Sequence, residues 1–303
     1  MEMEFNNFTE LVQKEVAKKV GENYHVKLND VMKNNGVVLR GITLLQDGGN
    51  ISPTIYLNPY YDAYENGEIT IAAIVTDVLE TYMQNKSSCN IDMKFFLNYE
   101  AVKSRIIFKL INTEKNRELL EDIPHIPFHD LSIVFQYLVS GEQFRDATIL
   151  IRNVHIGLWK VNAHDLYECA LENTPLLQGY ELADMKTILG EYYASGVIDD
   201  EEIEDMQQEV PMYVLSNKSR VNGAACILYK DLLKDFSMEV DKDLYILPSS
   251  THEVILLPSD GTQESAQLKE MVQEVNRMQV AEEEVLSDSV YYYDREKDVI
   301  ICA

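Results

Sequence analysis

The chain has 303 residues, of which 46% are hydrophobic and 25% are charged, so it can bury the core of two ordinary domains or one large one and is not expected to be disordered. Its 26 basic and 51 acidic residues give a formal net charge of −25. Because a negative field repels phosphate groups and anionic lipid, we expect neither a nucleic acid nor a membrane as partner.

The cysteines and the apolar runs indicate a cytoplasmic protein. The four cysteines lie far apart in the sequence, so no CxxC zinc or redox motif is present; they are Cys89, Cys169, Cys226 and Cys302. The N-terminus has no basic segment followed by an apolar one, and no apolar run approaches the roughly 18 residues of a membrane span. We expect reduced thiols, no cofactor and no resident metal.

The first hundred residues show clear helix and strand patterns. Phe5, Phe8, Val12 and Val16 recur at helical spacing, which predicts an amphipathic helix over residues 4–20. Turn signals separate three stretches typical of strands, and a second periodic helix follows them. These elements are predicted at 24–28, 37–45, 51–57 and 71–82.

The middle of the chain carries a mixed pattern. Apolar runs predict strands at 105–111, 131–139 and 148–154, with a loop at 153–160. Helical spacing predicts one helix around Leu166 and Ala170 and another over residues 182–192. Asn173-Thr174-Pro175 is expected to break the chain between them, because a proline disfavours the helical conformation of the residue before it.

The C-terminal part alternates regularly between strands and helices. Its order is strand, helix, two strands, helix, two strands, at 212–215, 229–236, 244–247, 254–257, 260–275, 290–293 and 299–302. That order is typical of helices packed on one face of a mostly antiparallel sheet. An acidic run at 199–205 precedes this part and predicts a linker or an exposed helix.

Together these patterns predict an α+β fold with mixed, mostly antiparallel sheets and helices packed on one face. The predicted domains are an N-terminal α+β domain over 1–196, an acidic linker over 197–210 and a C-terminal α/β sandwich domain over 211–303.

A polar turn between two apolar strands is the strongest candidate site. Ser250, His252 and Glu253 would supply the hydroxyl, imidazole and carboxylate of a hydrolase. In an extended segment, however, Ser250 and His252 share a face about 6.6 Å apart, and Glu253 points to the opposite face. The alternative is architectural: Ser249 and Ser250 bond the turn backbone while His252 bonds a neighbouring loop.

A second polar cluster lies earlier in the chain. Asn217-Lys218-Ser219-Arg220 precedes small residues that open a helix, where backbone N–H groups and the Arg220 guanidinium can bind a phosphate. Asn217, Arg220 and Ser249 are therefore candidate binding residues, although a close helix–sheet contact is the favoured explanation of the small residues. The nearest approach to a basic patch adds Lys230 and Lys234.

His125 and His129 are four residues apart and would chelate a metal on one helix face. Pro124 and Pro127 argue against a regular helix at that place, so no metal site is assigned.

Four segments carry a resemblance to known families: MYVLSN (212–217), NGAACILY (222–229), LYILPSSTHEVI (244–255) and YYYDR (291–295). Together with the N-terminal helix, they make most of the chain resemble a family of uncharacterised proteins from anaerobic gut bacteria. The C-terminal third is also similar to a second uncharacterised bacterial family that has the same Leu-Pro-Ser-Ser and His-Glu pattern. The resemblance implies a recurring polar pattern at 217–253 and no catalytic residue.

The leading functional hypothesis is a non-catalytic cytoplasmic binding or interaction protein with an unknown protein or small-molecule partner. It is supported by the absence of a complete catalytic constellation and by the acidic surface. One alternative is a hydrolase-like enzyme that uses Ser249, Ser250, His252 and Glu253. Another is an acidic inhibitor that docks on a basic partner protein.

Overall fold

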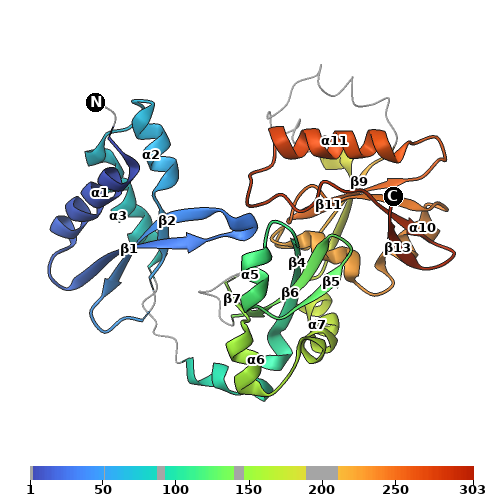
Figure 1. The fold of residues 1–303 in the computed structure, drawn as a ribbon, viewed down its shortest axis with the longest axis horizontal. Coiled ribbons are helices and arrows are strands. Elements are labelled where there is room, and N and C mark those ends of the chain that lie inside the picture. Colours follow the sequence, from blue (N-terminus) through green and yellow to red (C-terminus); the bar gives the residue numbers. More distant parts are fainter. Residues whose placement is uncertain (1–2, 51, 87–92, 140–146, 189–210) are drawn as a thin grey trace. The chain divides into compact units, whose positions relative to one another are not determined.

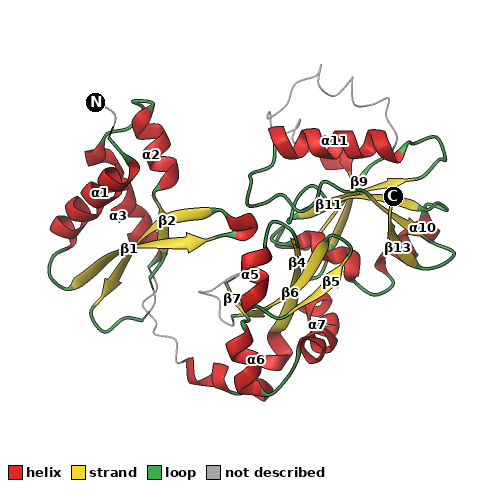
Figure 2. Cartoon of the chain, viewed as in Figure 1, coloured by secondary structure: helices red, strands yellow, loops and turns green. Residues whose placement is uncertain are grey.

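The structure is a computed structural model that describes residues 3–50, 52–86, 93–139, 147–188 and 211–303 (Figure 1). Its contacts divide the chain into two compact units, Met1–Lys94 and Phe95–Ala303. All strand pairings in the described residues are antiparallel, and helices accompany every sheet (Figure 2). The predicted α+β class with mostly antiparallel sheets is thus confirmed. None of the helices among these residues is long and apolar enough to cross a bilayer.

The first unit packs helices on a three-stranded sheet of order β1-β2-β3. Its elements are α1 (Phe5–Val20), β1 (Tyr24–Met32), η1 (Asn34–Gly36), β2 (Val38–Gln46), β3 (Thr54–Tyr56), α2 (Asn58–Glu65) and α3 (Ile71–Asn85). Phe8, Val12 and Val16 are fully buried, as their helical spacing predicted, and they share a core with Ile42 and Leu44 of β2. Each such side chain contributes about 1.5–3 kcal/mol through burial.

The second unit begins within η2 (Met93–Leu97) and contains a four-stranded sheet in which β6 pairs with β4, β5 and β7. Its elements are α4 (Tyr99–Val102), η3 (Lys103–Arg105), β4 (Ile106–Asn112), α5 (Arg117–Asp122), β5 (His125–Phe128), β6 (Leu131–Leu138), β7 (Thr148–Leu150), α6 (Asn153–Trp159) and α7 (Ala163–Gln178). β4 and β6 are buried along nearly their whole length, which explains their continuous apolar sequence.

A six-stranded sheet of order β13-β12-β10-β11-β9-β8 completes the second unit. Its elements are β8 (Glu181–Asp184), β9 (Tyr213–Ser216), η5 (Gly223–Leu228), α10 (Leu232–Glu239), β10 (Leu244–Leu247), β11 (Glu253–Pro258), α11 (Ser265–Met278), β12 (Tyr291–Asp294) and β13 (Val299–Cys302). Alternate residues of β10 enter different cores: Leu244 and Ile246 pack with α10, whereas Leu247 packs with α11. Helices therefore cover both faces of this sheet, not one.

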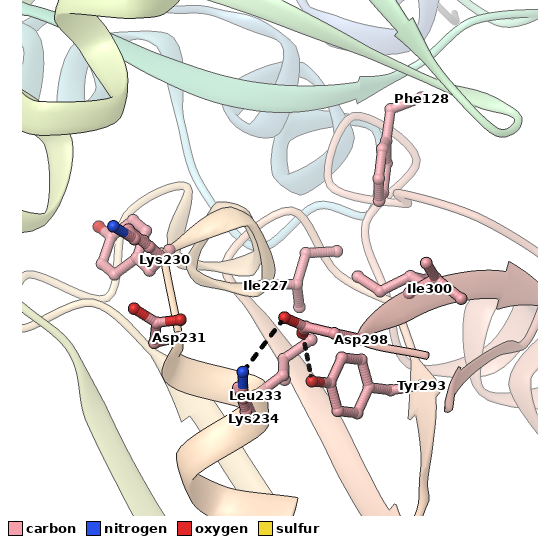
Figure 3. Close-up of a pocket in the computed structure, with 11 residues that line it drawn as sticks. Phe128, Ile227, Lys230, Asp231, Leu233, Lys234, Tyr293, Asp298 and Ile300 are labelled. Carbon is pink, nitrogen blue, oxygen red and sulfur yellow. Dashed lines mark hydrogen bonds and ion pairs between the residues drawn. The ribbon is translucent and has the colours of Figure 1, made fainter. Parts of the chain in front are cut away.

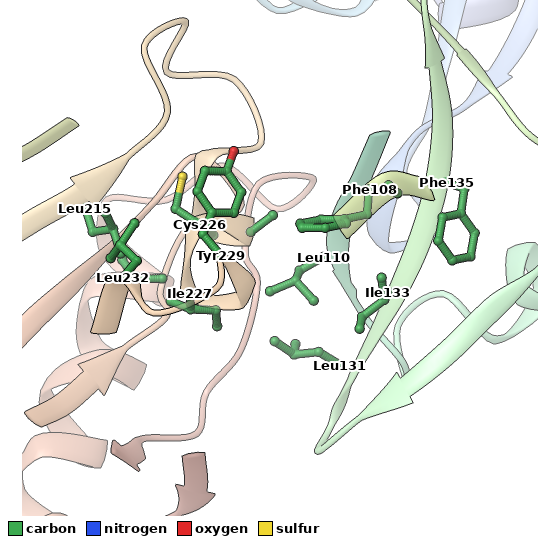
Figure 4. Packing of buried hydrophobic residues seen from close by; sticks show 14 of the residues in the cluster. Phe108, Leu110, Leu131, Ile133, Phe135, Leu215, Cys226, Ile227, Tyr229 and Leu232 are labelled. Atoms are coloured by element: carbon green, nitrogen blue, oxygen red, sulfur yellow. The ribbon is translucent and has the colours of Figure 1, made fainter. Parts of the chain in front are cut away.

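One hydrophobic core joins the two sheets of the second unit. Side chains of η5 and the following segment face side chains of β4 and β6 (Figure 4). The rings of Tyr229 and Phe108, for example, lie 6.2 Å apart between centroids. Residues before and after the predicted linker thus contribute to the same core. The predicted linker at 197–210 lies outside the described residues, so the domain boundaries at 196 and 211 stay predictions.

Three local predictions were wrong. Residues 153–159 form α6 instead of a loop, and Leu182 lies in strand β8 instead of a helix. Pro175 lies inside α7 and does not break the chain. The adjacent Thr174 is fully buried, and its hydroxyl donates to the Ala170 carbonyl at 2.7 Å while accepting the Phe108 N–H at 3.1 Å. These contacts tie the last turns of α7 to β4 and hold the helix through the proline.

Candidate functional site

The predicted polar turn is built around a hydroxyl that accepts a hydrogen bond from a backbone N–H. Ser250 is buried, and its Oγ accepts the N–H of His252 at 3.0 Å. Within the described residues, no hydrogen bond joins the Ser250 hydroxyl to the imidazole of His252. A nucleophile needs its base at about 2.6–3.2 Å, so this arrangement does not activate Ser250. The geometry matches the architectural alternative, in which a serine side chain bonds the turn backbone.

Both ring nitrogens of His252 are occupied by other groups. Nδ1 accepts the backbone N–H of Asn222 at 3.3 Å. Nε2 lies 3.3 Å from a carboxylate oxygen of Glu284. A neutral imidazole that accepts at Nδ1 carries its proton on Nε2, so the ring donates to Glu284. His252 therefore links the loop before η5 to the segment before β12, and neither nitrogen is free to take a proton from a substrate.

Two other predicted residues, Asn217 and Arg220, lie in the loop between β9 and η5. Asn217 is buried; its amide donates to the Val221 carbonyl at 2.8 Å, and its Oδ1 accepts the Val221 N–H at 3.2 Å. Arg220 has φ 55° and pairs with Glu181 at 3.5 Å. These contacts shape a tight loop. They leave the guanidinium on the surface beside a carboxylate.

Ser249 and Glu253 lie at the two ends of the turn. The carbonyl of Ser249 accepts the Leu286 N–H at 3.0 Å. Glu253 begins β11 and pairs in register with Ser216 of β9, whose hydroxyl donates to the His252 carbonyl at 2.7 Å. The structure thus brings all six predicted residues into one region and connects them largely through backbone hydrogen bonds. None of the six lines either of the two hollows described below.

A hollow lies elsewhere, beside strand β13 (Figure 3). Its volume is about 520 Å³. We call it the edge pocket, and it is lined by Phe128, Ile227, Tyr229, Lys230, Asp231, Leu233, Lys234, Tyr293, Asp298, Val299 and Ile300. These residues come from β5, from η5 and the start of α10, and from the hairpin of β12 and β13. Most of the lining is apolar or aromatic, as is usual for ligand sites.

Four charged residues, two of each sign, line the edge pocket. Lys234 lies 3.7 Å from Asp298, and Tyr293 donates its hydroxyl to the same carboxylate at 2.6 Å (Figure 3). Burial, followed by that hydrogen bond, raises the pKa of Tyr293 above its ordinary value, so the phenol stays protonated. No ion pair or hydrogen bond among the described residues engages Lys230. The pocket thus offers apolar walls and one cation available to a ligand.

A smaller hollow of about 300 Å³ lies beside the same segment. It shares Tyr229 and Lys230 with the edge pocket and includes Leu182 of β8. Burial raises the pKa of Tyr229 and raises that of the neighbouring Cys226 to about 12, so both are neutral packing groups at physiological pH.

The two histidines that are four residues apart in the sequence make different contacts in the structure. His125 lies in β5, and its Nδ1 is 3.1 Å from the Ile123 carbonyl. His129, at φ 54°, stacks on Tyr291 with ring centroids 5.2 Å apart. In the part of the chain that the structure describes, no group of three or more His, Cys, Asp or Glu side chains is placed to hold a metal ion.

Comparison with protein-family models gives a match over residues 5–295 to a family described as a family of unknown function (DUF5688). The chain belongs to this family. Searches of curated proteins and of solved structures found no match.

Sequence reasoning missed the partners of the polar turn and most of the edge pocket. Glu284, the partner of His252, is one of three consecutive glutamates, and nothing in the sequence distinguishes it. The pocket combines residues near 128, 230 and 298, which come together only through the sheet. The sequence signals only Lys230 and Lys234 of the pocket, as part of its nearest approach to a basic patch.

Proposed function

We propose that this chain is a non-catalytic binding protein whose binding site is the edge pocket. The supporting observation is the hollow of about 520 Å³ itself, with apolar walls from Phe128, Ile227 and Leu233. Its lining also includes Lys230, which has no ion-pair partner among the described residues. Hollows of this size and lining are the usual form of small-ligand and side-chain sites.

The polar turn also supports a non-catalytic function, because its polar groups are engaged within the fold. The groups of Ser250 and His252 that would carry out hydrolysis are used in hydrogen bonds within the fold. The hydrolase hypothesis would need the imidazole to leave Asn222 and Glu284 before it acts on a substrate. The inhibitor hypothesis rests on the net charge of −25 alone. A cytoplasmic location and a bacterial source remain part of the proposal.

The pocket is tested with the neutral apolar dye Nile red and a matched pair of variants. Ile300→Trp fills the pocket with an indole, because Ile300 lines it. Ile301→Trp adds the same ring to the opposite face of β13, since successive strand residues alternate. We expect dye fluorescence with the wild type and Ile301→Trp and its loss with Ile300→Trp. Equal fluorescence from all three proteins would contradict the proposal.

A further inference from the structure

Strand β13 is an edge of the six-stranded sheet and carries no charge. Its sequence is Val299-Ile300-Ile301-Cys302, and it pairs with β12 alone among the described strands. The opposite edge, β8, carries Glu181 and Asp184. Natural sheets protect their edges with charges, because an uncharged edge pairs with other chains. The two edge strands therefore differ in charge, and only β8 carries charged residues that discourage pairing with another chain.

The backbone of β13 has hydrogen-bonding groups directed away from the sheet. The Ala303 N–H donates to the Val290 carbonyl at 2.9 Å, so this residue pair is a hydrogen-bonded one. Hydrogen-bonded and non-bonded pairs alternate along an antiparallel ladder. In the observed register, the N–H and C=O groups of Ile300 and Cys302 then point away from β12. An additional strand would find two donors and two acceptors there.

Both faces of this edge suit the side chains of such a strand. Ile300 belongs to the face that packs against the main core, and the edge pocket lies on that face. Ile301 lies on the other face and is 46% exposed, whereas Val299, which is 42% exposed, also lines the pocket. Alternate side chains of an added strand would enter the pocket, and the remaining ones would cover Ile301.

We propose that β13 binds an extended segment of a partner protein as an additional strand, with apolar side chains at alternate positions and basic residues at its ends. This inference rests on the proposed binding function of the edge pocket and names the ligand as a peptide. The net charge of −25 favours a basic partner and opposes a second copy of this chain. A second copy of β13 would also bring only an isoleucine and a thiol toward a pocket of about 520 Å³.

The probe is the fluorescein-labelled peptide Lys-Val-Thr-Phe-Thr-Val-Lys, followed by anisotropy in about 0.15 M NaCl, where long-range attraction is largely screened. The control peptide has proline in place of both threonines, which keeps the charge and removes backbone donors. We expect the first peptide to bind and the second to bind at least about tenfold more weakly.

Three variants locate the binding. Ile300→Pro removes an outward N–H, and Ile301→Lys places a cation on the exposed face; each is expected to weaken binding by about tenfold or more. Met278→Lys adds the same charge on α11 at a side chain that is 75% exposed and should leave affinity unchanged. Because Ile301 is half exposed, Ile301→Lys should fold even if Ile300→Pro does not, as circular dichroism will show.

Several results would overturn the inference: no binding by the peptide, equal binding by the proline peptide, or equal loss in Met278→Lys. A wild-type dimer in sedimentation that Ile301→Lys converts to a monomer would assign the edge to a second copy and also overturn it. Dye binding that Ile300→Trp abolishes, without peptide binding, would leave the proposed function standing and reject only the strand.

Discussion

Gly223 shows why the polar pattern at 217–253 needs particular residues. A Cβ at this position would lie 2.2 Å from Ser216 Oγ, 2.4 Å from the His252 carbonyl oxygen and 2.5 Å from the Asn217 nitrogen. Two of these atoms are backbone, so the clash cannot be relieved by rotating a side chain. The loop that holds His252 and the start of η5 therefore meet at a contact that only glycine permits.

We expect Gly223→Ala to lower the free energy of unfolding by about 3 kcal/mol, because the added methyl group overpacks the junction. The matched control is Gly157→Ala in α6, where a Cβ meets open space. That change should stabilise the protein by about 0.5–1 kcal/mol through helix propensity. Urea denaturation of both variants measures the two values. A Gly223→Ala protein as stable as the wild type would contradict the close approach.

At the scale of elements, the sequence predicted the helices and strands whose apolar residues recur at a regular spacing. The helix α1 and the strands of the six-stranded sheet from β9 onward were predicted because apolar residues recur at the period of each element. The missed elements lack such a signal. α2 and α6 are short, α6 exposes Val154 and Leu158, and β8 is a strand only because it pairs with β9. For the same reason, the edge pocket was not visible, since its lining depends on pairings distant in sequence.

Asp130 joins two elements distant in sequence, the β5–β6 turn and the segment that enters β12. Its carboxylate accepts hydroxyl hydrogen bonds from Ser287 at 2.6 Å, from Ser289 at 3.3 Å and from Tyr291. Tyr291 and Ser287 are completely buried. Burial, followed by the hydrogen bond to Asp130, raises the pKa of Tyr291, so the phenol remains a donor at neutral pH.

Asp130→Ala should lower the free energy of unfolding by about 2–4 kcal/mol, because it leaves buried hydroxyls without their acceptor. Asp122→Ala is the control, since that carboxylate is 54% exposed and, among the described residues, pairs with Arg152. Its removal should cost about 1 kcal/mol or less. The comparison is made by urea denaturation at neutral pH. Similar losses in the two variants would show that Asp130 does not hold the sheets together.

At the scale of the whole molecule, the acidic excess acts on stability as well as on the choice of partner. A formal charge of −25 makes the folded chain repel itself, because folding brings the carboxylates together. The ion pairs that the structure describes are mostly between exposed side chains, as in Lys18–Glu15 and Arg117–Glu114. Such pairs contribute about 0–1 kcal/mol each, so they offset little of the repulsion.

Salt should therefore stabilise this protein. Raising NaCl from about 0.01 M to about 0.15 M shortens the Debye length from about 30 Å to about 8 Å, which screens repulsion between distant carboxylates more than attraction within a contact pair. We expect the midpoint of thermal unfolding to rise over that range, and scanning calorimetry at neutral pH measures it. An equal osmolality of glycerol separates screening from a general solvent effect. A midpoint that falls with NaCl would mean that local ion pairs outweigh the net charge, and it would weaken the argument that this charge selects a basic partner.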